Sequence, residues 1–287
     1  MGSVASKVVV VTGASRGAGR GIALALGASG ATVYVTGRTR VEGEAPLPGT
    51  VQATADAVTA AGGVGIAHYC DHGNDDEVKA LFDRVEAEQG RLDILVNNAT
   101  CLPDALTQKG PFWKKPLELT DLWNVGMRSH YTASWFAAPL LLKSDKGLVV
   151  NTSSFGGRIY MHGPAYGAGK AATDKMAHDM AVDFRPYNVA VISIWMGLLL
   201  TERTQAVFDA EPEMYADLAA TAEHPEFTGR VIVALSDDPA LMEKTGKVLI
   251  GAELGEEYGV TDVNGKQPIS HRAFFGEATV FGDAVVE

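Results

Sequence analysis

The sequence is poor in the residues that metal sites and disulfide frameworks need. Its 287 residues include only two cysteines, Cys70 and Cys101, which lie far apart and form no CxxC motif. The seven histidines show no spacing typical of metal ligands. We therefore expect reduced thiols, no metal site and a cytoplasmic protein.

Long apolar runs and positive charge are also scarce. The apolar stretch at 191–200 has about half the length needed to span a bilayer, and no signal peptide is recognisable. There are 24 basic and 35 acidic residues, which gives a net charge of −11. Such a surface repels nucleic acid and anionic membranes, so we expect neither as a partner.

No Pro/Gly/Ser-rich linker or internal repeat divides the chain, so one large domain fits its length. Short apolar runs rich in β-branched residues alternate with helical patterns throughout. This order predicts an α/β fold, a doubly wound parallel sheet of seven strands in a single domain. The expected strands are 7–12, 31–36, 64–70, 92–96, 146–151, 188–195 and 246–250.

A glycine-rich turn follows the first of these strands and opens a helical pattern. It reads TGxxxGxG and contains Thr12, Gly13, Ser15, Gly17 and Gly19. Glycines let the backbone approach a pyrophosphate, and the helix N-terminus presents amides and partial positive charge to it. Strand, turn and helix in this order predict a dinucleotide site.

The end of the second strand bears on which dinucleotide binds. An acidic residue there favours NAD, but Gly37 stands at that place and Arg38 follows it. Arg16 lies inside the glycine-rich turn. Because guanidinium groups bind phosphate in a bidentate manner, this pair favours the 2′-phosphate of NADP(H), with NAD(H) as the alternative.

Tyr166 and Lys170 are four residues apart in a predicted helix, so their heads share one face. A nearby ammonium favours the phenolate and is expected to lower the tyrosine pKa. Gly167 and Gly169 lie between them, and each costs a helix roughly 1 kcal/mol relative to alanine. A helix with two such glycines is expected to have a neighbour packed close to its backbone.

Three motifs together resemble the short-chain dehydrogenase/reductase family. They are TGxxxGxG, the Asn97-Asn98-Ala99 sequence after the fourth strand, and Ser153…Tyr166xxxLys170, and the resemblance covers about residues 6–251. It implies the strand order 3-2-1-4-5-6-7. It also implies hydride transfer between a nicotinamide cofactor and a small carbonyl or alcohol substrate.

In that family the tyrosine is the general acid, the lysine lowers its pKa and binds the nicotinamide ribose, and a serine holds the carbonyl oxygen. The resemblance places these roles on Tyr166, Lys170 and Ser153. Thr152 and Ser154 are rival hydroxyls. Ser153 is chosen because it precedes Tyr166 by thirteen residues, which matches the family.

The resemblance also implies further contacts with the cofactor. Asp71 would bind the adenine amino group, and Asn98 and Ala99 would lie along the adenosine ribose. Gly197 and Thr201 would bracket the nicotinamide.

The chain departs from the family pattern at three positions. Gly126 stands where many members have an asparagine of a proton relay, Thr100 replaces the glycine of NNAG, and Met196 replaces the proline of Pro-Gly. These departures motivate an alternative to the enzyme, a catalytically weak NADPH-binding regulator or scaffold. The intact Ser/Tyr/Lys set favours the enzyme.

The remaining segments suggest a domain plan. Residues 1–251 are expected to form the catalytic domain, with a substrate lid at about 198–228. Residues 252–287 would pack on the same domain or on a neighbouring subunit. The segments 118–143 and 165–187 are predicted as long helices that, by analogy with the family, pair subunits into a homodimer or homotetramer.

Overall fold

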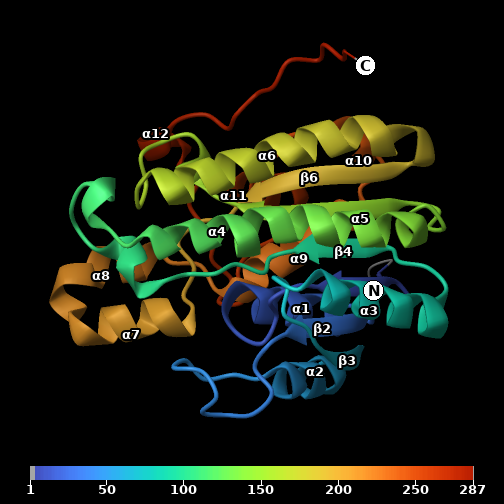
Figure 1. The fold of residues 1–287 in the computed structure, drawn as a ribbon, viewed down its shortest axis with the longest axis horizontal. Coiled ribbons are helices and arrows are strands. Elements are labelled where there is room, and N and C mark those ends of the chain that lie inside the picture. Colours follow the sequence, from blue (N-terminus) through green and yellow to red (C-terminus); the bar gives the residue numbers. More distant parts are fainter. Residues whose placement is uncertain (1–3, 287) are drawn as a thin grey trace.

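The computed structural model describes residues 4–286, and its centre is a parallel sheet of seven strands (Figure 1). The strand order is β3-β2-β1-β4-β5-β6-β7, so both the predicted fold class and the predicted order are confirmed. The strands are β1 (Val8–Val11), β2 (Thr32–Gly37), β3 (Val64–Tyr69), β4 (Ile94–Asn97), β5 (Gly147–Ser153), β6 (Val189–Trp195) and β7 (Val248–Ile250).

Side chains of each central strand alternate between two apolar layers. Val9 and Val11 of β1 pack into one core cluster, whereas Val8 and Val10 pack into the other. Because successive strand residues point to opposite faces, a strand covered on both sides must be apolar throughout. This is why unbroken β-branched runs identify the strands in the sequence.

Helices cover both faces of the sheet. The first layer contains α1 (Gly17–Ala28), α2 (Val51–Ala60), α9 (Pro225–Asp237), α10 (Leu241–Lys244) and α11 (Gly251–Tyr258). The second contains α3 (Asp75–Gln89), α5 (Ser129–Leu141) and α6 (Pro164–Phe184). The result is a three-layer sandwich with helix, sheet and helix.

The prediction of one long helix at 118–143 is wrong in one respect, because this segment is divided into several shorter elements. A 3₁₀ turn (Leu117–Thr120), α4 (Asp121–Trp123) and a π-type turn (Asn124–Arg128) precede α5. Gly126 has φ 140° within this stretch. An L side chain rarely adopts that conformation, so glycine permits the break.

Two segments lie beyond the sheet. Helices α7 (Glu202–Ala210) and α8 (Pro212–Thr221) lie together at one end of the molecule, within the predicted lid (Figure 1). The chain after β7 ends with α12 (Arg272–Phe275) and an extended tail along α6, where Phe281 contacts the ring of His178. Within residues 4–286 no helix is long and apolar enough to cross a membrane.

Candidate active site

A cleft of about 1280 Å³ brings most of the predicted site residues together. It is bounded by the glycine-rich turn, the ends of β2, β4 and β5, the start of α6 and the start of α7. The predicted residues that line it are Gly13, Ser15, Arg16, Gly17, Gly19, Arg38, Asp71, Asn98, Ala99, Tyr166, Lys170 and Thr201. Thr12, Ser153 and Gly197 are not in its lining.

Thr12 and Asn98 join the glycine-rich turn to the end of β4. The Thr12 hydroxyl accepts hydrogen bonds from the amides of Asn98 and Ala99 at 2.8 and 2.9 Å. The Asn98 amide group donates to the carbonyls of Thr12 and Gly13 at 2.9 and 3.1 Å. Both side chains are buried, so their hydrogen bonds fix the position of the turn relative to β4.

Glycine is required in this turn because of close packing. A Cβ atom at Gly13, whose φ is +65°, would lie 2.6 Å from the Cα atom of Ala99. A Cβ atom at Gly19 would lie 2.4 Å from the Gly13 carbonyl oxygen. The turn therefore presses α1 against β4, and the amide of Gly17 lies at the start of α1 beside the cleft.

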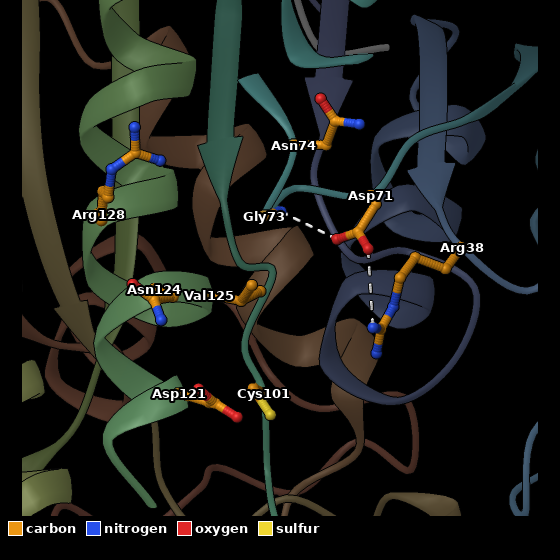
Figure 2. Close-up of a pocket in the computed structure, with 9 residues that line it drawn as sticks. All are labelled: Arg38, Asp71, Gly73, Asn74, Cys101, Asp121, Asn124, Val125 and Arg128. Atoms are coloured by element: carbon orange, nitrogen blue, oxygen red, sulfur yellow. Dashed lines mark hydrogen bonds and ion pairs between the residues drawn. The ribbon is translucent and has the colours of Figure 1, made fainter. Parts of the chain in front are cut away.

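The end of β2 forms the expected adenosine side of the cleft. Arg38 is 72% exposed and its Nη1 lies 3.9 Å from Asp71 Oδ2. Figure 2 shows this pair beside a smaller hollow of about 520 Å³, which Val125 and Cys101 also line. The second carboxylate oxygen of Asp71 accepts a hydrogen bond from the amide of Gly73 at 2.9 Å.

Arg16, which the sequence analysis pairs with Arg38 as a ligand of the 2′-phosphate, hydrogen-bonds within the protein instead. Its Nε donates to the Pro48 carbonyl at 2.9 Å, and its Nη2 donates to Thr39 Oγ1 and to the Gly49 carbonyl at 2.9 and 2.8 Å. Arg16 thus anchors the 39–49 insertion over the cleft. At the expected adenosine side, Arg38 therefore has fewer contacts within the protein than Arg16.

Tyr166 lies in the first turn of α6, where Pro164 begins the helix. A Cβ atom at Gly156 would lie 2.5 Å from the Tyr166 ring, and one at Gly167 would lie 3.2 Å from the Gly156 carbonyl oxygen. The loop after β5 therefore packs directly on the start of α6. This explains the glycine after Tyr166 and confirms the expected close neighbour.

The hydroxyl beside the tyrosine belongs to Ser154. Ser154 Oγ lies 2.9 Å from Tyr166 Oη, and either atom can donate. The choice of Ser153 is not supported by this geometry, because Ser153 is 1% exposed and its Oγ donates to the Lys170 carbonyl at 3.5 Å. Successive residues at a strand end point to opposite sides, so only one of the two serines can face the phenol.

Lys170 follows Tyr166 by one helical turn and lines the same cleft. Its Nζ donates to the Thr152 carbonyl at 3.0 Å and lies 5.9 Å from the centre of the Tyr166 ring. Burial lowers the pKa of Lys170 to about 8, although the carboxylate of Asp174 opposes this shift. A buried ammonium that loses its proton near neutrality suits acid–base chemistry.

The expected lowering of the tyrosine pKa is not seen in this arrangement. Burial raises the pKa of Tyr166; the hydrogen bond from Ser154 lowers it, and the charge of Asp174 raises it. Lys170 is directed at a backbone carbonyl rather than at the phenol oxygen. Tyr166 is therefore held as a protonated phenol, a proton donor.

Asp174 is a buried carboxylate one turn beyond Lys170 that the sequence analysis did not single out. It is 1% exposed and accepts hydrogen bonds from Ser193 Oγ at 2.6 Å and from Trp195 Nε1 at 2.9 Å. Burial raises its pKa, whereas these hydrogen bonds and the charge of Lys170 lower it. Its spacing of four residues from Lys170 was the available signal.

Two of the departures from the family pattern contact each other. A Cβ atom at Gly126 would lie 2.8 Å from Thr100 Oγ1. The threonine side chain thus occupies the space beside the glycine. Gly126 also accepts a hydrogen bond from Thr173 Oγ1 through its carbonyl at 3.3 Å.

The loop after β6 leads from the cleft to α7 and α8. Gly197 donates its amide proton to the buried Glu223 carboxylate at 3.1 Å, and burial raises the pKa of Glu223 to about 7. Thr201 caps α7, within the predicted lid at 198–228, where its hydroxyl accepts from the amide of Thr204 at 3.3 Å. Glu223 is separated from Gly197 by 26 residues, so no local pattern predicts the contact.

Metal ligation finds no support in the part of the chain that the structure describes. Residues 4–286 contain no group of three or more histidine, cysteine, aspartate or glutamate side chains that could hold an ion. The donors of the cleft are instead backbone amides, arginines, hydroxyls and one lysine. This set fits an anionic dinucleotide, and the cleft is large enough for one.

Comparison with known proteins agrees with this chemistry. The family model described as short chain dehydrogenase matches residues 7–212. Dehydrogenase/reductase SDR family member 1 from Mus musculus is 42% identical over 91% of this chain and 84% of its own length. The human protein of that name is 39% identical over the same shares.

More distant relatives share the fold. Cyclopentanol dehydrogenase from Comamonas testosteroni is 31% identical over 88% of this chain and 98% of its own. The crystal structure of a short chain dehydrogenase from Mycobacterium thermoresistibile superposes with a TM-score of 0.75 at 25% identity, over 91% of this chain and 90% of that one. The protein therefore belongs to the short-chain dehydrogenase/reductase family of oxidoreductases.

Proposed function

We propose that the protein is an NADP(H)-dependent carbonyl reductase, or an alcohol dehydrogenase in the reverse direction. The observation that carries this is the 2.9 Å contact between the Tyr166 and Ser154 hydroxyls, with Lys170 one turn away in the same cleft. When bound, the nicotinamide supplies or accepts the hydride. We also predict a cytoplasmic homodimer or homotetramer.

The chain's own residues supply the proton chemistry. Tyr166 donates its phenolic proton to the substrate carbonyl oxygen, and Ser154 holds that oxygen by a hydrogen bond. Lys170 places positive charge beside the phenol as it loses its proton, which stabilises the phenolate. Ser153 hydrogen-bonds to the Lys170 carbonyl and to Asp174, and it thereby helps to position these two residues.

Preference for NADP(H) is proposed from the end of β2. Gly37 leaves no carboxylate there to bind a ribose 2′-hydroxyl, and Arg38 is exposed at the cleft. Asp71 at 3.9 Å orients the guanidinium without covering it. An exposed arginine in a protein of net charge −11 is a local positive site for a 2′-phosphate.

The test is consumption of NADPH, followed by absorbance, against aldehydes, open-chain ketones, quinones and cyclic ketones. Cyclic ketones belong in the panel because one relative is named as a cyclopentanol dehydrogenase. We expect Tyr166→Phe to abolish turnover and to leave dinucleotide binding within about twofold. Tyr187→Phe, which changes an exposed tyrosine, is the matched control.

One result would count against the proposed mechanism, and another against the enzyme itself. Turnover that survives in Tyr166→Phe would remove this residue from the mechanism. Stoichiometric NADPH binding without turnover across the panel would favour the alternative, a dinucleotide-binding regulator. The lack of a relay asparagine at Gly126 is the observation that keeps this alternative in view.

A further inference from the structure

The first turn of the lid helix α7 contacts two separate walls of the cleft. Glu202 Oε2 accepts a hydrogen bond from the backbone amide of Gly17, at 2.9 Å, in the glycine-rich turn. The next residue, Arg203, donates through Nη1 to Asp104 at 3.0 Å, in the segment after the Asn-Asn-Ala motif. The lid therefore touches the cofactor side and the substrate side of the cleft with adjacent residues.

The contact of Glu202 supplies something that α1 lacks. Helices α2 and α3 are capped by the side chains of Thr50 and Asn74, but α1 has no side-chain cap and no acidic residue in its first turn. Helix N-termini carry unpaired amides and partial positive charge, which favour an anion. Glu202, which is 185 residues away in the sequence, provides this anion.

The same amide belongs to the turn that the sequence predicts for pyrophosphate binding. One N–H group cannot donate fully to two anions, and a carboxylate repels a phosphate at this distance. We propose that Glu202 is an internal ligand of the glycine-rich turn that a dinucleotide must displace, so that this residue sets the affinity of the site. The inference rests on the proposed dinucleotide binding.

Displacement would also release the contact between α7 and the glycine-rich turn. Arg203 would still bind Asp104, whose side chain is 94% exposed, and the Leu102 carbonyl at 3.3 Å, and Phe208 of α7 would stay buried. Exposed ion pairs contribute little in water, so the first turn of α7 would then be held less firmly at the cofactor side of the cleft. Binding of the dinucleotide is thus coupled to the position of the lid over the substrate side.

The test is the dissociation constant of NADPH and of NADH, measured by titration calorimetry, for the wild type, Glu202→Gln and Glu213→Gln. Glu213 is an exposed lid residue, so its variant removes the same charge without the contact. We expect Glu202→Gln to bind both dinucleotides roughly three- to tenfold more tightly, which lies within the effect that a charge at a helix terminus can have. Glu213→Gln should stay within about twofold of the wild type.

Adenosine 2′-phosphate, which lacks the pyrophosphate, separates displacement from a general charge effect. Its affinity should be the same for the wild type and Glu202→Gln. An equal gain for this ligand, an equal gain in Glu213→Gln, or no gain in Glu202→Gln would each overturn the inference. A wild type that binds neither dinucleotide would overturn the proposed function and the inference together.

Hydrogen exchange tests the contact itself in the protein without ligand. In Glu202→Ala the Gly17 amide loses its acceptor and should exchange faster than in the wild type, whereas Glu213→Gln should leave its rate unchanged. Equal rates in the wild type and Glu202→Ala would show that the carboxylate does not hold this amide in solution.

Discussion

Asp174→Asn should move the alkaline limit of carbonyl reduction to lower pH. The Asp174 carboxylate is buried one helical turn from Lys170; burial lowers the pKa of that lysine and the Asp174 charge raises it, and together they give a pKa of about 8. The carboxylate also raises the pKa of Tyr166. Loss of its charge lowers both values. Reduction needs the protonated forms, so activity should fall at a lower pH in the variant.

The size of the shift follows from the helix geometry. Residues four apart have Cβ atoms about 5–6 Å apart, and two charges at that distance interact by about 3 kcal/mol at an effective dielectric constant near 20. That energy corresponds to about two pKa units. The two side chains extend away from each other, Lys170 toward Thr152 and Asp174 toward Ser193 and Trp195. Their charges are therefore farther apart than the Cβ atoms, and we expect half of this pKa shift, about one unit.

The assay is the pH dependence of kcat/KM for NADPH-driven reduction. The wild type should lose activity with a midpoint near pH 8, the pKa of Lys170, and Asp174→Asn about one unit lower. His130 on α5 also lies near Lys170, but burial lowers its pKa to about 3, so it stays neutral in this range. Asp183→Asn, an exposed change of equal charge on α6, is the control.

A structural defect would not imitate this result. Loss of the hydrogen bonds to a buried carboxylate lowers the melting temperature and kcat, but it does not move a pH midpoint. A folded Asp174→Asn protein that binds dinucleotide and keeps the wild-type midpoint would refute the reasoning. A midpoint that moves to higher pH would refute it as well.

Three further predictions concern the other parts of the site. Ser154→Ala should lower kcat by about 10²-fold, which is the effect of losing one hydrogen-bond donor to a developing oxyanion. Ser153→Ala should lower kcat far less. The opposite order of kcat values would favour Ser153, the residue selected from the sequence. Arg38→Ala should raise the dissociation constant of NADPH about tenfold or more, which is the contribution of a hydrogen bond to a charged group. The dissociation constant of NADH should change by less than about threefold. Equal changes for the two dinucleotides would contradict the NADP(H) preference. Gly126→Asn should lower the melting temperature, because the φ of 140° and the close Thr100 hydroxyl disfavour a side chain at this position. Adding Thr100→Gly to that variant should recover part of the lost melting temperature. No recovery would show that the contact with Thr100 is not the cause of the loss.

The sheet could be predicted from the sequence because its signal is local. The central strands are runs rich in apolar β-branched residues, because they are buried on both faces, whereas β3 at the edge of the sheet is only partly buried. The strand order came from the family resemblance, since no local pattern encodes it. The ends of the strands differ by one to a few residues from the prediction, as at β1, which spans Val8–Val11.

The sequence selected Ser153 for the candidate site, whereas in the structure the hydroxyl of the next residue, Ser154, lies beside Tyr166, and this difference has a geometric cause. Counting thirteen residues back from Tyr166 gives Ser153, but the side-chain direction alternates along a strand end. The path of the loop after β5 decides which serine meets the phenol, and that loop packs closely on α6 because Gly156 in the loop and Gly167 in α6 have no side chains. A count along the chain contains no information on this direction.

The departures at Thr100 and Gly126 illustrate why motif positions cannot be judged one at a time. In the sequence they are two separate losses, 26 positions apart. In the structure the threonine hydroxyl lies 2.8 Å from the position of a Cβ atom at residue 126, and the backbone there has a φ that favours glycine. The two residues therefore form one packing unit. An asparagine cannot be restored at 126 by a single substitution, so any proton path from Lys170 in this protein must use groups other than that side chain.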